Sequence, residues 1–80
     1  MKTMLKTLKL YRNIKRFYKI FGGYINSDPN PIKLRDLKSH DFLLGVQFDL
    51  FEAIGNDDDT TNPMNIWLTK IINHINNIIL

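Results

Sequence analysis

Few residues in this 80-residue chain could carry out acid–base or metal chemistry. It contains no Cys, which excludes disulfides, thiolate zinc sites and thiol nucleophiles. Its two histidines, His40 and His74, are too few for a multi-histidine metal site. Asp41 directly follows His40, but adjacent residues on a helix do not face one another, so they form no catalytic pair. His74 stands among asparagines, where we expect a solvated or capping histidine.

The only acidic run, Asp57-Asp58-Asp59, is expected on a loop after Gly55. A calcium loop needs oxygen ligands at alternating positions and a distal Glu, and this run has neither feature. We therefore expect a solvated loop and no metal site. Phosphate-binding loops, nucleotide-binding fingerprints and zinc-protease motifs are also missing from the sequence. These observations predict a protein that is not an enzyme and has no cofactor of its own.

Basic residues offer the remaining chemistry, and they are concentrated at one end of the chain. Residues 1–21 carry seven Lys and Arg and no acid, whereas residues 22–80 carry four bases and eight acids. A basic segment of this kind suits an acidic surface, which can be a nucleic acid, an anionic lipid or an acidic protein. No helix-turn-helix, zinc-finger or RNA-recognition signature accompanies it, so nucleic-acid binding is only weakly supported.

This basic segment is predicted to be an amphipathic helix over about 3–21. Four apolar residues recur at i, i+4, i+7 and i+11, which gives one apolar face. They are Leu10, Ile14, Phe17 and Phe21, and the basic residues Arg12, Lys15, Arg16 and Lys19 fall on the opposite side. Gly22 and Gly23 are expected to end the helix.

The first turns depart from this pattern, because Leu5 and Leu8 fall on the side that later carries the basic residues. Residues 1–7 are therefore either a separate arm or part of a mixed apolar and basic surface for a partner. The whole basic segment also has the acid-free, amphipathic character of a mitochondrial targeting helix, here one that is not cleaved. It lacks the uninterrupted apolar block of a secretory signal.

Two further helices are predicted before the acidic run. Asn30 and Pro31 could open a weak helix over 31–38, and Ser39 is a suitable N-cap for a helix over 40–54. The second of these helices has two apolar faces. One face holds Phe42, Leu43, Val46, Leu50 and Ile54, and the other holds Leu44, Phe48 and Phe51. A helix that is apolar on two sides either lies at the centre of its bundle or is covered by something else.

The last helix is predicted over 63–80, with Asn62 as N-cap and Pro63 at its first position. Its apolar stripe is expected to be core or a subunit contact: Met64, Trp67, Leu68, Ile71, Ile72, Ile75, Ile78 and Ile79. Asparagines and Lys70 interrupt this segment, so it is not expected to span a membrane. The sequence thus predicts a single all-α domain over 1–80, a small bundle of three main helices with a short, weak fourth.

A short pattern in the first helix indicates a family. Leu10-Tyr11-Arg12 lies within the helix, and Arg16 follows one turn after Arg12. Lys19 and Phe21 complete the run before the two glycines. This pattern resembles the LYR-motif family of small mitochondrial proteins, whose first helix carries Leu-Tyr-Arg, a second basic residue one turn on and a downstream Phe.

The resemblance implies a three-helix adaptor on the matrix side of the mitochondrion, such as an accessory subunit of a respiratory complex. Many members bind the acidic acyl carrier protein and take the acyl chain of its phosphopantetheine among their helices. Arg12, Lys15, Arg16 and Lys19 would then face the carrier, while Leu10, Tyr11 and Phe21 would position the helix and border the acyl chain. Other subunits of the host complex would be further partners.

A different class of function is also compatible with this sequence. Ile, Lys and Asn, whose codons are AT-rich, make up 28 of the 80 residues. A small regulatory or inhibitory protein of an AT-rich phage or bacterium, which binds a host protein or a nucleic acid, is therefore the alternative.

Overall fold

The computed structural model describes residues 2–21, 32–55 and 61–80. It contains α1 (Lys2–Phe21), the short 3-10 helix η1 (Leu34–Lys38), α2 (His40–Ile54) and α3 (Pro63–Ile79). The described residues form no strand. The predicted all-α bundle of three main helices is confirmed.

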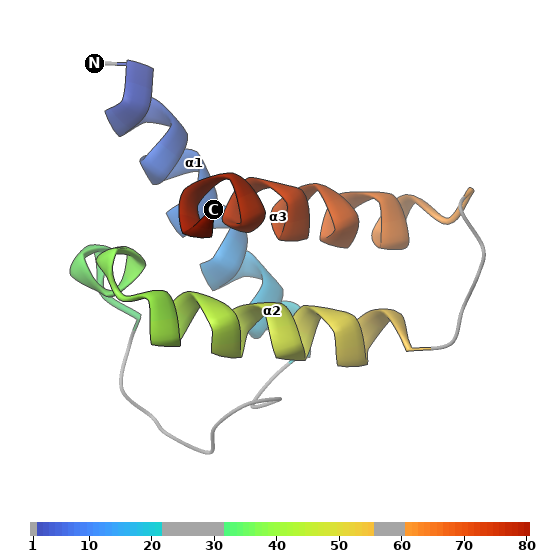
Figure 1. Cartoon of the computed structure of the whole chain (residues 1–80). Coiled ribbons are helices and arrows are strands. Elements are labelled where there is room, and N and C mark those ends of the chain that lie inside the picture. Colours follow the sequence, from blue (N-terminus) through green and yellow to red (C-terminus); the bar gives the residue numbers. More distant parts are fainter. Residues whose placement is uncertain (1, 22–31, 56–60) are drawn as a thin grey trace.

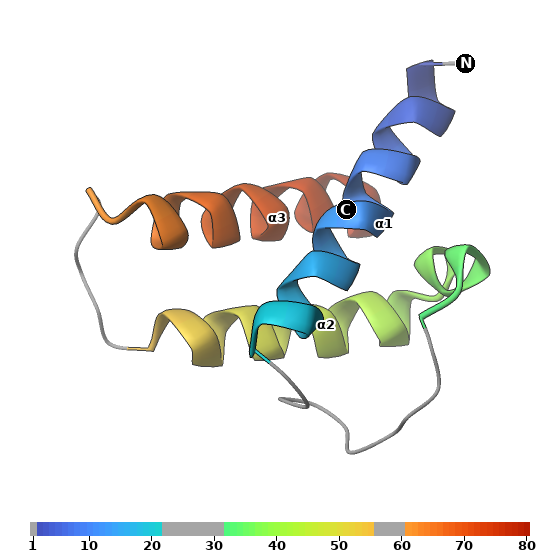
Figure 2. The same ribbon diagram turned by 180° about the vertical axis from the view of Figure 1, so that it is seen from behind.

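α2 and α3 lie side by side and run in opposite directions, and α1 crosses them at a steep angle (Figure 1). Seen from behind, α1 passes in front of both helices, so one whole side of α1 faces outward (Figure 2). α1 is a single helix from Lys2 onward, and its first turns project beyond α3. Residues 2–7 are therefore continuous with the helix and do not form a separate arm.

The core is built from the apolar faces of all four helices. Each of the three α-helices turns its i, i+3, i+4 and i+7 positions to one side, so regular spacing in the sequence becomes a continuous buried stripe, and η1 adds Leu37. The core residues are at most 5% exposed: Leu10, Ile14, Phe17, Leu37, Leu43, Val46, Leu50, Leu68, Ile71, Ile72 and Ile75. Burial of these side chains from water is the main favourable contribution to folding.

The ends of α2 and α3 follow local rules that the sequence already contains. The Ser39 hydroxyl accepts a hydrogen bond from the backbone N–H of Phe42 at 3.2 Å. The Asn62 side-chain oxygen accepts one from the N–H of Met64 at 2.9 Å, with Pro63 at the first helical position. Both predicted N-caps are confirmed. At the end of α2, Gly55 adopts a φ of +64°, which residues with a Cβ rarely adopt.

The short helix before α2 differs from the α-helix expected over 31–38. It is a 3-10 helix confined to Leu34–Lys38, and Asn30 and Pro31 lie outside the described residues. Its start is fixed by the Asp36 carboxylate, which accepts the Lys33 backbone N–H at 2.8 Å. Leu37 is its only buried residue among the five. Five residues with one inward side chain suffice for a tight 3-10 turn but give little support to an α-helix.

Side-chain hydrogen bonds connect the helices around this core. The Tyr18 hydroxyl of α1 donates to the Asp49 carboxylate of α2 at 2.9 Å. The Gln47 amide of α2 donates to the Ile72 carbonyl and to the Asn76 side chain of α3, at 3.2 Å and 2.7 Å. These bonds satisfy polar groups that would otherwise be costly to bury, and they also fix the register between helices. None of the helices described here has the length and apolar character needed to cross a bilayer.

The burial of Asp49 predicts an unusual pH dependence of stability. Burial, together with the nearby Glu52 carboxylate, raises the pKa of Asp49, although the Tyr18 hydrogen bond partly opposes that rise. A carboxyl group whose pKa is higher in the folded state binds its proton more readily there than in the unfolded chain. The contribution of Asp49 to stability should therefore increase as the pH falls from neutral toward the ordinary Asp pKa of about 3.9.

Urea unfolding of the wild type and of Asp49→Asn at several pH values tests this prediction. The wild type should gain stability relative to the variant as the pH is lowered. A difference that stays constant with pH, or that moves in favour of the variant on acidification, would contradict it.

Candidate functional site

The outward side of α1 carries a basic face made of Arg12, Lys15, Arg16 and Lys19. All four side chains are exposed. Their position follows from the burial of Leu10, Ile14 and Phe17, because residues on the other side of the same helix must then point away from the core. This outward side of α1 is the one seen in Figure 2.

Charges on the basic face are not neutralised within the described part of the molecule. No described carboxylate forms an ion pair with any of these four residues. Lys15 instead places its ammonium group 4.9 Å from the centroid of the Tyr11 ring. The Arg16 guanidinium lies 5.5 Å from the centroid of the Trp67 ring. Cation–π contacts of this kind orient a side chain without removing its charge, so the face keeps its positive potential.

The other three residues singled out from the sequence anchor the helix. Leu10 is fully buried. Tyr11 is half-buried, and its hydroxyl donates to the Ile32 carbonyl at 2.9 Å. Phe21 is also half-buried, with its ring 5.1 Å from that of Phe17. The predicted site therefore divides into four exposed basic side chains and three residues that hold the helix against the bundle.

One part of this arrangement was not predicted from the sequence. Trp67 of α3 donates its indole N–H to the Asn13 side chain at 3.1 Å, while its ring receives Arg16. The spacing of apolar residues placed Trp67 in the apolar stripe of the last helix, and the sequence predicted no role for Asn13. A half-buried indole needs an acceptor for its N–H, but the sequence does not say which helix supplies it.

A second exposed surface lies on α2, and we call Leu44, Phe48 and Phe51 the α2 stripe. These side chains are 47%, 74% and 57% exposed. Asp41 and Glu52 lie on the same outer side and are exposed, and a Cβ on Gly45 would meet nothing within 4 Å. Of the two alternatives for the second apolar face, the described structure excludes a central position in the bundle, because nothing described covers the stripe.

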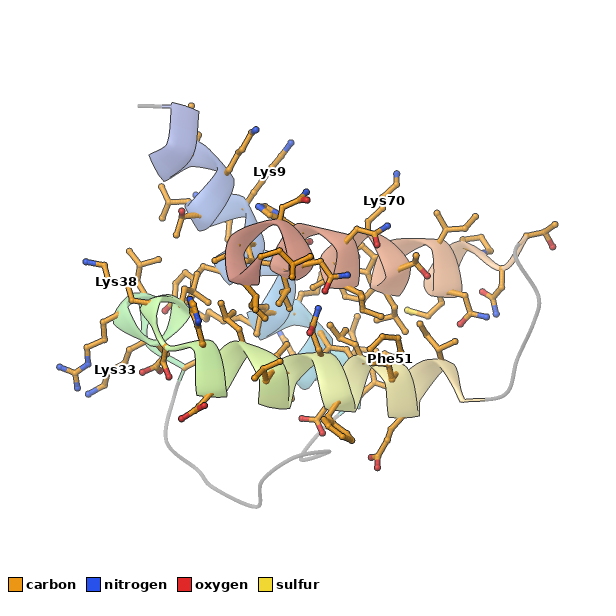
Figure 3. The ribbon with its side chains drawn as sticks, in the orientation of Figure 1. Lys9, Lys33, Lys38, Phe51 and Lys70 are labelled. Carbon is orange, nitrogen blue, oxygen red and sulfur yellow. The ribbon has the colours of Figure 1, made fainter. Side chains whose placement is uncertain are left out.

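A groove between the first half of α1 and the second half of α3 is the third feature. Its lining consists of Lys6, Thr7, Lys70, Asn73, His74, Asn77 and Ile78. Lys9 and Lys70 extend past α3 on the side away from α2 (Figure 3). His74 is half-buried in this cationic surrounding, whereas the sequence suggested a solvated or capping residue. Only the tertiary structure shows that Lys70 and His74 of α3 line the same groove as Lys6 of α1.

Metal binding finds no support in the described residues, where no three His, Cys, Asp or Glu side chains gather. The run Asp57-Asp58-Asp59 lies outside the described residues. Neither a protein-family model, nor a curated protein, nor a solved structure matches this chain.

The Trp67 contacts give a prediction about how α1 is held on α3. Trp67→Phe keeps an aromatic ring for Arg16 but removes the donor to Asn13, which should lower the free energy of unfolding by about 1 kcal/mol. Trp67→Leu also removes the ring, and it should lower the free energy of unfolding further, by about 0.5–1 kcal/mol for the lost cation–π contact.

Urea unfolding followed by circular dichroism measures both variants. Combining each with Arg16→Met provides the control, because the extra loss in Trp67→Leu should vanish once the guanidinium is absent. Equal stabilities of the Phe and Leu variants would show that the Arg16 contact contributes nothing.

Proposed function

We propose that this protein is a non-enzymatic adaptor that binds an acidic acyl carrier protein through the basic face of α1. The observation that supports this proposal is a helix whose exposed side carries four cations and meets no carboxylate among the described residues. Such a surface favours an acidic macromolecule, because opposite potentials speed encounter and fix orientation. The similarity of Leu10-Tyr11-Arg12 and Arg16 to the LYR pattern selects the carrier protein among acidic partners.

Two features of α1 favour a protein partner of defined shape. Arg16 is oriented on Trp67 and Lys15 on Tyr11, so part of the basic face is preorganised. Preorganised side chains lose less conformational entropy on binding. Leu5, on the same outward side, is 66% exposed and adds apolar area next to the cations. A mixed surface of this kind is typical of a protein interface, which combines apolar contact with a charged rim.

An acyl chain delivered by the carrier requires a change in the bundle. Leu10, Ile14 and Phe17 are fully buried in the core against which α1 packs. A chain inserted at this place has to move α1 outward and takes over its apolar contacts. Each buried CH2 group of the chain contributes about 0.8 kcal/mol, so a fatty chain could offset that movement. Intact-mass measurement of the native complex would detect the acyl-phosphopantetheine directly.

The α2 stripe supports a second role as an accessory subunit of a larger assembly, which the LYR resemblance places in a mitochondrial respiratory complex on the matrix side. Apolar side chains exposed at i, i+4 and i+7 form a contiguous strip that typically marks a protein interface. Among the described residues of α2, the exposed charges on this outer side are acidic, Asp41 and Glu52. A basic amphipathic segment of a host subunit would match the stripe in both charge and apolar character.

Reversal of charge on the basic face tests the carrier proposal. The double variant Arg12→Glu/Lys19→Glu should bind the acyl carrier protein at least about tenfold more weakly at low salt, since it replaces two attractions by repulsions. Both side chains are exposed, so helicity should be unchanged. Affinity can be measured by isothermal titration at several salt concentrations, and the wild-type affinity should fall as salt rises.

Lys33→Glu/Lys38→Glu, at the two ends of η1, makes the same change in net charge at two exposed residues outside α1. This control should bind the carrier as the wild type does. The alternative, a phage or bacterial regulator, would be favoured if the wild-type protein does not bind the acyl carrier protein but retards DNA in a gel-shift assay and loses this effect at higher salt.

The α2 stripe gives a separate prediction. Phe48→Ser removes a side chain that is 74% exposed, so the free energy of unfolding should change by at most about 0.5 kcal/mol. Carrier binding should persist, whereas co-purification with the native larger assembly should be lost. Ile66→Ser on α3, at a residue that is 42% exposed, is the matched control and should keep the assembly. Equal behaviour of the two variants would rule out the stripe as the contact.

A further inference from the structure

Four nitrogen-bearing side chains from opposite ends of the sequence converge at the groove between α1 and α3. Lys6 and Lys9 are three residues apart on α1, and Lys70 and His74 are four residues apart on α3. Both spacings place side chains on one face of a helix. Lys6, Lys70 and His74 line the groove, and Lys9 lies close enough to act electrostatically on the His74 imidazole.

The remaining lining of the groove suits a polar anion with an organic part attached. Asn73 and Asn77 provide side-chain amides, whose N–H groups can donate hydrogen bonds. Ile78 provides an apolar wall, and none of the described carboxylates lines the groove. The groove is open to solvent and has a volume of about 560 Å³, which is larger than a single small ion requires.

The type of basic residue in the groove, lysine or arginine, indicates whether a carboxylate or a phosphoryl group fits better. Arginine, whose planar fork matches a carboxylate, does not line the groove. Lysines are compact point charges on flexible stems, and they serve widely as phosphate ligands. Lys6 and Lys70 in the lining, with Lys9 nearby, supply more positive charge than a single carboxylate needs. A phosphoryl group, which carries close to two negative charges at neutral pH, fits this excess.

His74 reports on the electrostatics of the groove. Burial lowers the pKa of His74, and the positive charges of Lys6 and Lys9 lower it further. Lys70 on the same helix is the other charged group in the lining. The imidazole is therefore mainly neutral at pH 7 when the groove is empty. An anion in the groove would counter the lysines and favour the imidazolium, so anion binding and protonation of His74 must promote each other.

We propose that the groove lined by Lys6, Lys70 and His74, with Lys9 beside it, is a binding site for a phosphoryl dianion, carried by a small phosphorylated ligand or by a phospholipid headgroup. The juxtaposition of Lys6 with Lys70 across two helices carries this inference, and it does not depend on the adaptor function of the basic face. The ligand's phosphate oxygens accept from the lysine ammonium groups and from the Asn73 and Asn77 amides. The attached organic group lies along Ile78.

The test is an NMR titration of the two histidine rings of the full chain with inorganic phosphate, against sodium chloride at equal ionic strength. Phosphate should raise the titration midpoint of His74 by about one pH unit, which corresponds to about a tenfold coupling. His40 is exposed on α2 and is not part of the groove lining, so its ring signals serve as the internal reference and should be the same in phosphate and in chloride. A His74 midpoint that is the same in phosphate and in chloride would overturn the proposal.

Two double variants distinguish phosphate binding in the groove from non-specific attraction of phosphate to a positively charged protein. Lys6→Met/Lys70→Met should abolish the effect of phosphate on His74. Lys33→Met/Lys38→Met removes two exposed lysines at the two ends of η1, on a different side of the molecule, and should retain the effect (Figure 3). Circular dichroism should show both variants folded, because all four side chains are exposed. Loss of the effect in the η1 variant as well would overturn the proposal.

Two further arms identify the source of the phosphoryl group. Glycerol 3-phosphate should reproduce the His74 shift if the ligand is a soluble phosphate ester. Co-sedimentation with phosphatidylcholine vesicles that contain phosphatidic acid, but not with phosphatidylcholine alone, indicates a lipid headgroup. The vesicle interaction must be lost in Lys6→Met/Lys70→Met. The site is supported by either the His74 shift with glycerol 3-phosphate or the binding of phosphatidic acid vesicles, provided that the effect is lost in Lys6→Met/Lys70→Met. If neither effect is seen, the proposal is overturned.

Discussion

The burial of one narrow stripe of α1 is the constraint on which the rest of the structure depends. Leu10, Ile14 and Phe17 are fully buried within the common core. Because this stripe must face the core, rotation of α1 about its axis is fixed. The other side chains of the helix then have a determined direction: Tyr11 and Tyr18 turn to the flanking elements, Lys6 turns toward α3, and the cations of the basic face turn outward.

Segregation of charge between helices is the second property of the molecule, and it follows from that fixed rotation. The charged residues of α1 are all basic, whereas α2 carries Asp41, Asp49 and Glu52 and no Lys or Arg. The two helices contact each other through the hydrogen bond from Tyr18 to the buried Asp49 and form no ion pair among the described residues. The exposed charges of the basic face, and those of Asp41 and Glu52, thus stay available at the surface, where they can select partners of opposite sign.

Three surfaces therefore coexist on a small bundle, and each has a different chemical character. The basic face of α1 suits an acidic macromolecule, the α2 stripe suits an amphipathic basic segment, and the groove suits a compact dianion. The groove and the basic face share α1 but use different sides of it, since Lys6 turns toward α3 and Arg12 turns outward. A ligand in the groove and a protein on the basic face could accordingly bind at the same time.

The sequence by itself determined the helices, their caps and the inner face of each. Repeats of apolar residues, Ser39, and Asn62 with Pro63 act through bonds and packing within a few residues, so their effect can be deduced without the fold. The exposure of Arg12, Lys15, Arg16 and Lys19 also followed from periodicity alone. The 3-10 form of η1 did not, because it depends on a single Asp36–Lys33 hydrogen bond and on one buried leucine.

Only the tertiary structure decided which helix faces meet. Periodicity gives each helix an inner side but not the crossing angle or the neighbour, which depend on how whole surfaces of side chains interlock. The bond from Trp67 to Asn13 joins residues 54 positions apart, and the groove joins Lys6 to Lys70. The sequence also could not determine that the α2 stripe is exposed. The pattern of an apolar stripe is the same whether a neighbouring helix covers it or leaves it open to a partner.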